Sequence, residues 1–196
     1  MAAPVYKPVV YSEVRRLILP GDQLLHRPSK HLHSRLIGMV GGGAVSYSHA
    51  GLAAWWGDCL LILETLQLAG ARAVMLSSQV EQAPGHYDVY RIRPPFDSAA
   101  AVEAMLRITG TPYGYRSLLR AGLRHVPGLG WLVPPNDPRW PPMCSQAVCR
   151  ADRAGGADPL PNQPEWKCEP WHLARPGFAD YQFTLFHTAD QIKVAA

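Results

Sequence analysis

PPMCSQAVCR, residues 141–150, places a cysteine at the start of a predicted helix. Proline is tolerated just before or inside the first turn of a helix, so Pro141 and Pro142 mark a beginning. Cys144 would then face unpaired backbone N–H groups and the positive end of the helix dipole, which both favour a thiolate. A thiolate attacks carbonyl carbon, so the stretch predicts a nucleophile. The alternative is a cysteine that is simply a small buried apolar residue.

The composition predicts a single loop-rich globular domain. The 196-residue chain is 47% hydrophobic and contains 19 prolines and 17 glycines. This length and composition suit one domain over residues 1–196, with a core at about residues 20–152. An N-terminal helix, Val9–Leu19, and a C-terminal extension with Trp166 and Trp171 are expected to pack on that core.

The charge pattern restricts the class of partner. The formal net charge is +4, and the basic residues form no run and do not alternate with aromatic residues. No nucleic acid partner is expected, and the charge supports at most attraction to an anionic surface such as a cell wall or membrane. No apolar run reaches the length of an integral membrane segment.

The N-terminal residues and the cysteines bear on localisation. Glu13, Arg15 and Arg16 stand where a Sec signal would need its apolar stretch, so synthesis in the cytoplasm is expected. Delivery to the cell wall, or a place in a virion, stays open. The four cysteines are expected to be free thiols, because the cytoplasm is reducing.

A β-hairpin is predicted where two β-like runs, Ala44–Trp56 and Cys59–Leu66, flank Gly57-Asp58. A turn centred on those two residues pairs Gly51 with Glu64. Side chains alternate along a strand, so His49 and Glu64 then share one face as diagonal neighbours, roughly 7–8 Å apart along the backbone. A turn longer by one residue would place Glu64 on the opposite face.

These two residues complete a possible catalytic set. A cysteine nucleophile needs a base, and the base needs a group that orients it. His49 lies among small residues that leave room for a neighbouring element, and Glu64 follows an apolar run and needs a partner. The alternative for His49 is an ordinary core histidine.

The remaining periodicity predicts further elements. The expected strands are Gln23–His26, Arg72–Leu76, Tyr87–Arg93 and Tyr181–His187, and the expected helices are Ser98–Thr109, capped by Asp97 or Ser98, and Arg116–Leu123.

Several short motifs, taken in order, resemble the circularly permuted branch of the NlpC/P60 cysteine hydrolases. This branch includes the YiiX/YebB-like proteins and is related to the lecithin–retinol acyltransferases. The motifs are Gly21-Asp22, Ser48-His49-Ala50-Gly51-Leu52, Leu63-Glu64, Gly110-Thr-Pro-Tyr-Gly114 and Cys144-Ser145. The resemblance implies an α+β, papain-like fold in which an antiparallel sheet packs against a helix with the cysteine at its N-terminus. In the usual NlpC/P60 order the cysteine helix comes first, whereas here His49 precedes Cys144.

The resemblance also implies roles for individual residues. Cys144 would be the nucleophile, His49 the base and Glu64 the third polar residue, with no metal or cofactor. An acyltransferase-like member would show a second histidine where Glu64 stands, so a hydrolase is favoured. One departure is Gln146, where many relatives have glutamate.

Other residues are candidates for contacts with substrate or with an oxyanion. The backbone N–H of Cys144 is the first expected donor, because it lies at a helix start. Tyr47, two residues before His49, is a candidate second donor or substrate-positioning group, and its alternative is an ordinary strand aromatic. Tyr113 is a candidate for lining the cleft, and Ser145 for a contact with the substrate or the oxyanion.

The expected function is hydrolysis of an amide bond in cell-wall (peptidoglycan) peptide, as the broad resemblance implies. A lipid amide or ester substrate, or acyl transfer, is an alternative that exposed apolar residues around the site would favour. A catalytically idle binding module, such as a virion component, is another.

Metal binding is disfavoured at two places. Cys144-x4-Cys149 with Cys168-x3-His172 resembles zinc spacing, but residues five apart on a helix point about 140° away from each other. His31-x-His33 has no acidic or cysteine partner nearby in the sequence.

Overall fold

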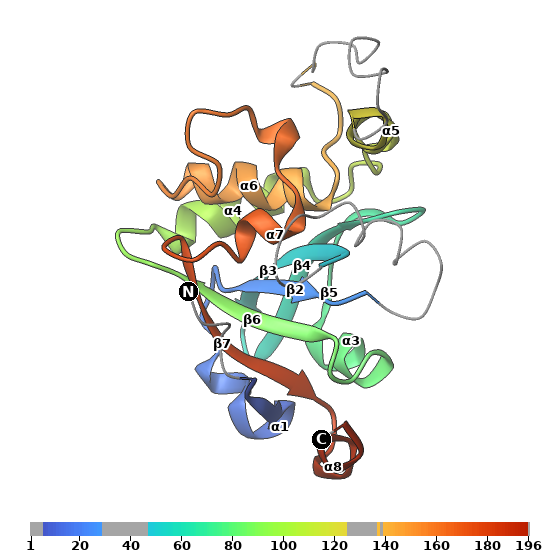
Figure 1. Cartoon of the computed structure of the whole chain (residues 1–196), viewed down its shortest axis with the longest axis vertical. Helices are drawn as coiled ribbons and strands as arrows, with labels where there is room; N and C mark the ends of the chain where they lie inside the picture. Colours follow the sequence, from blue (N-terminus) through green and yellow to red (C-terminus); the bar gives the residue numbers. More distant parts are fainter. Residues whose placement is uncertain (1–5, 29–46, 125–136, 138, 196) are drawn as a thin grey trace.

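The computed structural model (Figure 1) describes residues 6–28, 47–124, 137 and 139–195. Within these residues, seven strands form one sheet in the order β1-β7-β6-β2-β3-β4-β5. All neighbouring strands are antiparallel except β1 and β7, which are parallel. The strands are β1 Pro8–Val10, β2 Gln23–His26, β3 His49–Trp56, β4 Cys59–Leu66, β5 Gly70–Met75, β6 Tyr87–Ile92 and β7 Ala179–Phe186. The expected α+β class is confirmed.

Helices cover both faces of the sheet (Figure 1). On one face lie α4 (Ser98–Ile108), α6 (Cys144–Ala154) and α7 (Pro170–Leu173), and on the other lie α1 (Tyr11–Val14) and α3 (Leu76–Gln82). The described helical elements are completed by α5 (Tyr115–Arg124), α8 (Ala189–Ala195) and the 3-10 turns η1 (Arg15–Leu17) and η3 (Glu165–Lys167). The two faces bury separate apolar clusters, one around Leu52, Met105 and Val148 and the other around Leu24, Ile62 and Val80.

The predicted hairpin is β3–β4, and its register is the predicted one. Trp56 pairs with Cys59 and Gly51 with Glu64 across the two-residue turn. Gly57 has φ +55°, the left-handed conformation that such a turn favours in glycine. Glu64 therefore lies on the His49 face of the hairpin.

Two helix predictions are also confirmed. The helix α6 begins at Cys144, with Met143 as its N-cap directly after Pro141 and Pro142. The helix α4 begins after Asp97, whose carboxylate accepts hydrogen bonds from the N–H groups of Ala99 and Ala100 at 3.0 and 3.1 Å. Both starts follow from local sequence, because a cap and a proline act within one turn.

Elsewhere the predicted elements were wrong or incomplete. The segment Val9–Leu19 is not one helix, because Val9 and Val10 pair with β7 as part of β1 and only one α-helical turn follows. The helix α3 was not predicted; Leu76 and Val80, four residues apart, are fully buried on its inner face. The helix α8 was also not predicted. His31, His33 and the start of the run at Ala44 lie outside the described residues.

Within the described ranges, every helix is too short or too polar to cross a bilayer.

Candidate active site

Cys144 lies where strands β3 and β4 separate. Their pairing ends at Gly51–Glu64, whereas β4 goes on pairing with β5 for two further residues. The N-terminus of α6 lies at this end of the sheet, and the backbone N–H groups of Ala50 and Ser145 both donate to the Cys144 sulfur. Two donors aimed at one sulfur stabilise a thiolate.

His49 connects the thiol to Glu64. Its Nε2 is 2.7 Å from Glu64 Oε2, and its ring also hydrogen-bonds the Cys144 thiol. Because Nε2 is engaged by Glu64, the ring nitrogen left for Cys144 is Nδ1. The structure therefore brings the predicted Cys144, His49 and Glu64 together in one chain of hydrogen bonds.

Arg72 holds the other side of Glu64. Its Nε and Nη2 both donate to Glu64 Oε1, at 2.9 and 2.6 Å, and the Glu64 side chain is only 1% exposed. Sequence reasoning missed this residue. The available signal was that Glu64 needed a buried partner and that Arg72 opened the next predicted strand, where it pairs directly with Glu64.

The charges of this group reinforce one another. Burial raises the pKa of Cys144, but the His49 ring and the two backbone donors outweigh it, so the net shift is downward. Burial lowers the pKa of His49, but Cys144 and Glu64 outweigh it, so the net shift is upward. Burial also opposes ionisation of Glu64, yet His49 and Arg72 lower its pKa. These directions describe a thiolate–imidazolium pair.

A neighbouring histidine does not compete with His49 for charge. His26 pairs with His49 across β2 and β3, and burial, followed by the charge of His49, lowers its pKa to about 4. His26 is therefore neutral at pH 7 and places no second positive charge beside the imidazolium.

Tyr113 lies on the other side of the thiol. Its hydroxyl is hydrogen-bonded to Cys144 and to the side chain of Gln67, and the residue is 7% exposed. Burial first, and then the charge of Cys144, raises the pKa of Tyr113, so the hydroxyl keeps its proton. The structure places this predicted cleft residue next to Cys144, together with Gln67, which sequence reasoning missed.

A close backbone approach holds Tyr113 against the helix start. A Cβ atom on Gly114 would lie 2.2 Å from the carbonyl oxygen of Pro141. The Ser117 hydroxyl donates to that same oxygen at 3.3 Å. The segment around Gly114 thus packs against the residues just before α6, which brings Tyr113 close to Cys144.

Two of the candidate residues have other partners, so these predictions need correction. The Tyr47 hydroxyl donates to Asp88 Oδ2 at 2.7 Å and lies 2.9 Å from the Tyr90 hydroxyl, so its proton is not available to an oxyanion. The Ser145 hydroxyl donates to the backbone oxygen of Cys168 at 2.7 Å, and the residue is fully buried. Only the backbone N–H of Ser145 faces the sulfur.

Residues near the helix have structural roles. Gln146 Oε1 accepts a hydrogen bond from the Met143 N–H at 3.2 Å and so caps the start of α6. The Cys149 and Cys168 side chains are hydrogen-bonded to each other and fully buried, whereas Cys144 contacts His49. The cysteines considered as zinc ligands therefore lie in two separate places.

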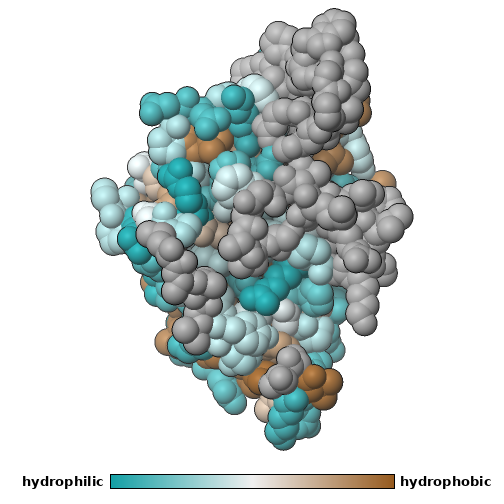
Figure 2. All heavy atoms as spheres, in the orientation of Figure 1, coloured by the Kyte–Doolittle hydropathy of each residue, from teal (hydrophilic) through white to brown (hydrophobic). Residues whose placement is uncertain are grey.

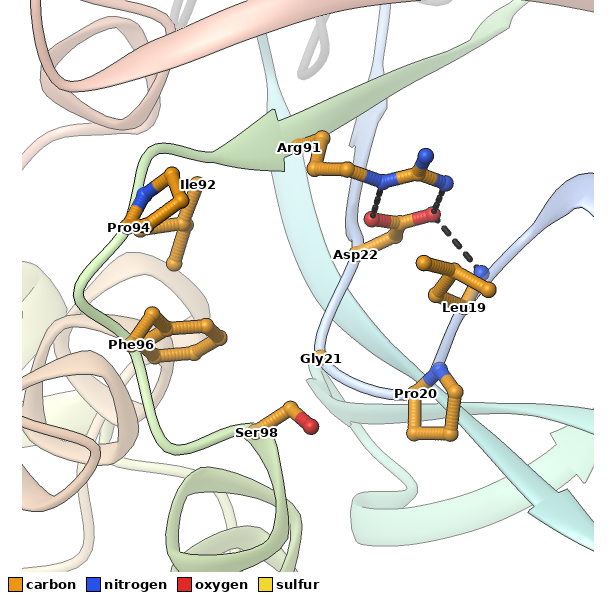
Figure 3. A pocket seen from close by; sticks show the side chains of 9 residues that line it. All are labelled: Leu19, Pro20, Gly21, Asp22, Arg91, Ile92, Pro94, Phe96 and Ser98. Carbon is orange, nitrogen blue, oxygen red and sulfur yellow. Dashed lines mark hydrogen bonds and ion pairs between the residues drawn. The ribbon is translucent and has the colours of Figure 1, made fainter.

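An open pocket lies between the turn before β2, the end of β6 and the start of α4 (Figure 3). Its polar wall is the ion pair between Arg91 and Asp22, and Asp22 also accepts from the Leu19 N–H at 2.8 Å. Gly21 has φ +85°, and a Cβ there would meet Ser98 at 2.8 Å. The Gly21-Asp22 motif therefore shapes this turn, and no candidate site residue lines the pocket.

The comparisons with known proteins identify a fold. No protein-family model and no curated protein matches the sequence. Among solved structures, the chain is similar to the crystal structure of the metalloprotein YiiX from Escherichia coli O157:H7. The TM-score is 0.60 and the identity 14%, over 86% of this chain and 98% of that chain. The fold is YiiX-like. This agrees with the YiiX/YebB-like part of the sequence resemblance.

YiiX is described as a metalloprotein. Within residues 6–28, 47–124, 137 and 139–195, no three His, Cys, Asp or Glu side chains are grouped as metal ligands. Both Glu64 oxygens already accept hydrogen bonds, and the positive charge of Arg72 beside them opposes a cation. The residues around Cys144 do not fit a metal centre.

Proposed function

We propose that this protein is a cysteine hydrolase that cleaves a carbonyl substrate through Cys144, His49 and Glu64. The observation that carries the proposal is the contact of a thiol at a helix N-terminus with His49, whose other nitrogen is held by Glu64 at 2.7 Å. A structural core histidine needs only a hydrogen-bond partner. A nucleophile needs an activated thiolate, a base and an orienting acid in this order.

In the proposed reaction, the Cys144 thiolate attacks the carbonyl carbon and forms a C–S bond. The His49 imidazolium gives its proton to the leaving nitrogen or oxygen as its bond to carbon breaks. Neutral His49 then takes a proton from water, which attacks the thioester and releases the acid and the thiolate. The backbone N–H of Cys144, in the first turn of α6, and the Tyr113 hydroxyl are the proposed oxyanion donors.

The two shifted pKa values define a pH window. Thiolate and imidazolium coexist above the lowered pKa of Cys144 and below the raised pKa of His49. Activity should therefore rise with pH through the first value and fall through the second.

Two substrate classes follow from different observations. An amide bond in cell-wall peptide is the first, from the NlpC/P60 resemblance of the sequence. A lipid amide or ester is the second, and it is favoured by three exposed apolar residues beside Gln67 and Tyr113: Leu68, Tyr115 and Leu119.

Labelling with iodoacetamide, read by peptide mapping against pH, tests the proposal. In the parent, Cys144 should react far faster than Cys59 below pH 7, although Cys59 is exposed and Cys144 only 7% exposed. The change His49→Ala should raise the apparent pKa of Cys144 toward the ordinary value of about 8.5. Labelling of Cys144 no faster than that of Cys59 would refute the enzyme and leave a binding module.

A further inference from the structure

Three apolar side chains are exposed beside the site. Leu68, in the turn between β4 and β5, is 97% exposed, and Leu119 and Tyr115, one turn apart on α5, are 65% and 49% exposed. The Leu68 backbone N–H donates to the Tyr115 hydroxyl at 2.7 Å, so the turn and the helix meet here. We call these three residues the apolar rim. Figure 2 shows hydrophobic atoms at the surface on the side where α5 lies in Figure 1.

The apolar rim is connected to the nucleophile through short contacts. The Tyr113 and Tyr115 rings meet edge to face, with centroids 5.2 Å apart. Gln67, the residue before Leu68, hydrogen-bonds Tyr113, which contacts Cys144. A ligand held by the rim would therefore lie next to the reacting sulfur.

Leu68 adopts a conformation that disfavours leucine. Its φ is +67°, in the left-handed region where glycine and asparagine are favoured. Its side chain is almost fully exposed, so burial within the chain does not offset this strain. A strained residue that presents an apolar side chain to solvent indicates contact with something outside the chain.

The charge around the rim indicates the partner. The sequence of α5, YRSLLRAGLR, contains three arginines and no acidic residue. Arg116 is exposed, and its guanidinium lies 5.3 Å from the centre of the Trp140 ring. Arginine pairs with phosphate, and leucine and tyrosine side chains enter the boundary between headgroups and acyl chains.

We propose that the apolar rim and Arg116 dock the protein on an anionic lipid surface. Leu68, Tyr115 and Leu119 enter the interface while Arg116 contacts lipid phosphate. Docking in this orientation presents Cys144 to acyl groups of lipids, a consequence that rests on the proposed function.

Sedimentation with vesicles tests the docking. The parent should bind equimolar phosphatidylglycerol–phosphatidylcholine vesicles and lose most of this binding on pure phosphatidylcholine. The change Leu68→Gly should weaken binding about tenfold, because one leucine no longer enters the interface. It should also raise Tm, because glycine relieves the left-handed strain, so weaker binding cannot be attributed to unfolding.

Val194→Ser is the matched control, because Val194 is 90% exposed on α8. This control should bind vesicles like the parent. The docking proposal would be overturned if the parent fails to bind anionic vesicles or binds both compositions equally. It would also be overturned if Leu68→Gly and Val194→Ser lose equal amounts of binding. Iodoacetamide labelling of the parent tests the hydrolase proposal separately. Fast labelling of Cys144 without vesicle binding would refute only the docking proposal. Vesicle binding with slow labelling of Cys144 would refute only the hydrolase proposal.

Discussion

The change Glu64→Gln is expected to inactivate the site through a reversal of hydrogen-bond direction. Glu64 Oε1 accepts two hydrogen bonds from Arg72, at 2.9 and 2.6 Å, and Oε2 accepts one from His49 at 2.7 Å. A glutamine has one oxygen and one NH2 group, so Arg72 and His49 compete for the oxygen.

The geometry decides this competition in favour of Arg72. Turning the NH2 toward Arg72 forfeits two hydrogen bonds from a charged donor, each about 1.5–3 kcal/mol, to keep one with His49. The oxygen thus prefers Arg72 by the worth of one such hydrogen bond, about 1.5–3 kcal/mol. The NH2 then faces His49 Nε2, which must accept, and the ring proton moves to Nδ1. His49 can no longer take a proton from Cys144.

The expected loss is about 10⁴-fold in turnover, the effect of the corresponding acid-to-amide change in a serine protease. Hydrolysis of a p-nitrophenyl ester measures turnover, and iodoacetamide labelling against pH should show the apparent pKa of Cys144 rising toward about 8.5. Glu103→Gln is the matched control: it breaks an exposed ion pair with Arg107 of 2.7 Å, away from the site, and should leave both readouts unchanged.

A second substitution distinguishes a change in the His49 tautomer from a loss of packing around Glu64. Adding Arg72→Met to Glu64→Gln removes the competing donors, so the glutamine oxygen can turn to His49. The double variant should be more active than Glu64→Gln alone. Turnover of Glu64→Gln within tenfold of the parent, or a double variant less active than the single one, would refute the reasoning.

Two further predictions concern packing and buried charge. In Gly114→Ala, the new Cβ starts 2.2 Å from the Pro141 oxygen and must move about 1.2 Å to reach ordinary contact at 3.4 Å. Because this displacement moves Tyr113 relative to Cys144, ester turnover should fall about 100-fold. The control is Gly155→Ala at the other end of α6, where the new Cβ would lie 2.5 Å from Phe96. This control should lower Tm with little change in turnover. Equal losses of turnover in Gly114→Ala and Gly155→Ala would contradict a positioning role for Gly114. Burial raises the pKa of Asp152 well above its ordinary value, and its Oδ2 accepts a hydrogen bond from Gln23 at 2.7 Å. Among the residues that the structure describes, the ionised form leaves Asp152 Oδ1 and Gln23 Oε1 without a partner, which favours a protonated acid. The unfolded carboxyl ionises above about pH 4, so stability falls as pH rises from there toward the raised pKa. Asp152→Asn cannot ionise, so the gain in Tm over the parent should grow from pH 4 to pH 7, and a constant difference would contradict a buried neutral acid.

Local sequence determined the parts of the site that follow from chain geometry. A two-residue turn at Gly57-Asp58 fixes the register of the hairpin. Because side chains alternate between the two faces of a strand, this register alone places Glu64 on the face of His49. Pro141 and Pro142 fix the start of α6 and so put Cys144 in its first turn. Both rules act over a few residues, which is why one sequence was sufficient.

Tertiary structure decided which side chains meet. Tyr47 was expected near Cys144, yet its hydroxyl donates to Asp88, a residue from another strand. Val9 and Val10 joined a sheet through β7, which lies more than 170 residues later in the chain. Hydrogen-bond partners and sheet edges depend on elements distant in sequence, and local propensity contains no information on where those elements lie.

The contacts of Arg72, Gln67 and Tyr113 also belong to the tertiary structure. Arg72 reaches Glu64 only because β4 continues along β5 after it leaves β3. Tyr113 reaches Cys144 only because Gly114 allows the backbone to approach Pro141. The sequence by itself therefore predicted that Cys144, His49 and Glu64 belong to one site, and the packing of separate segments determined the groups that hold them in place.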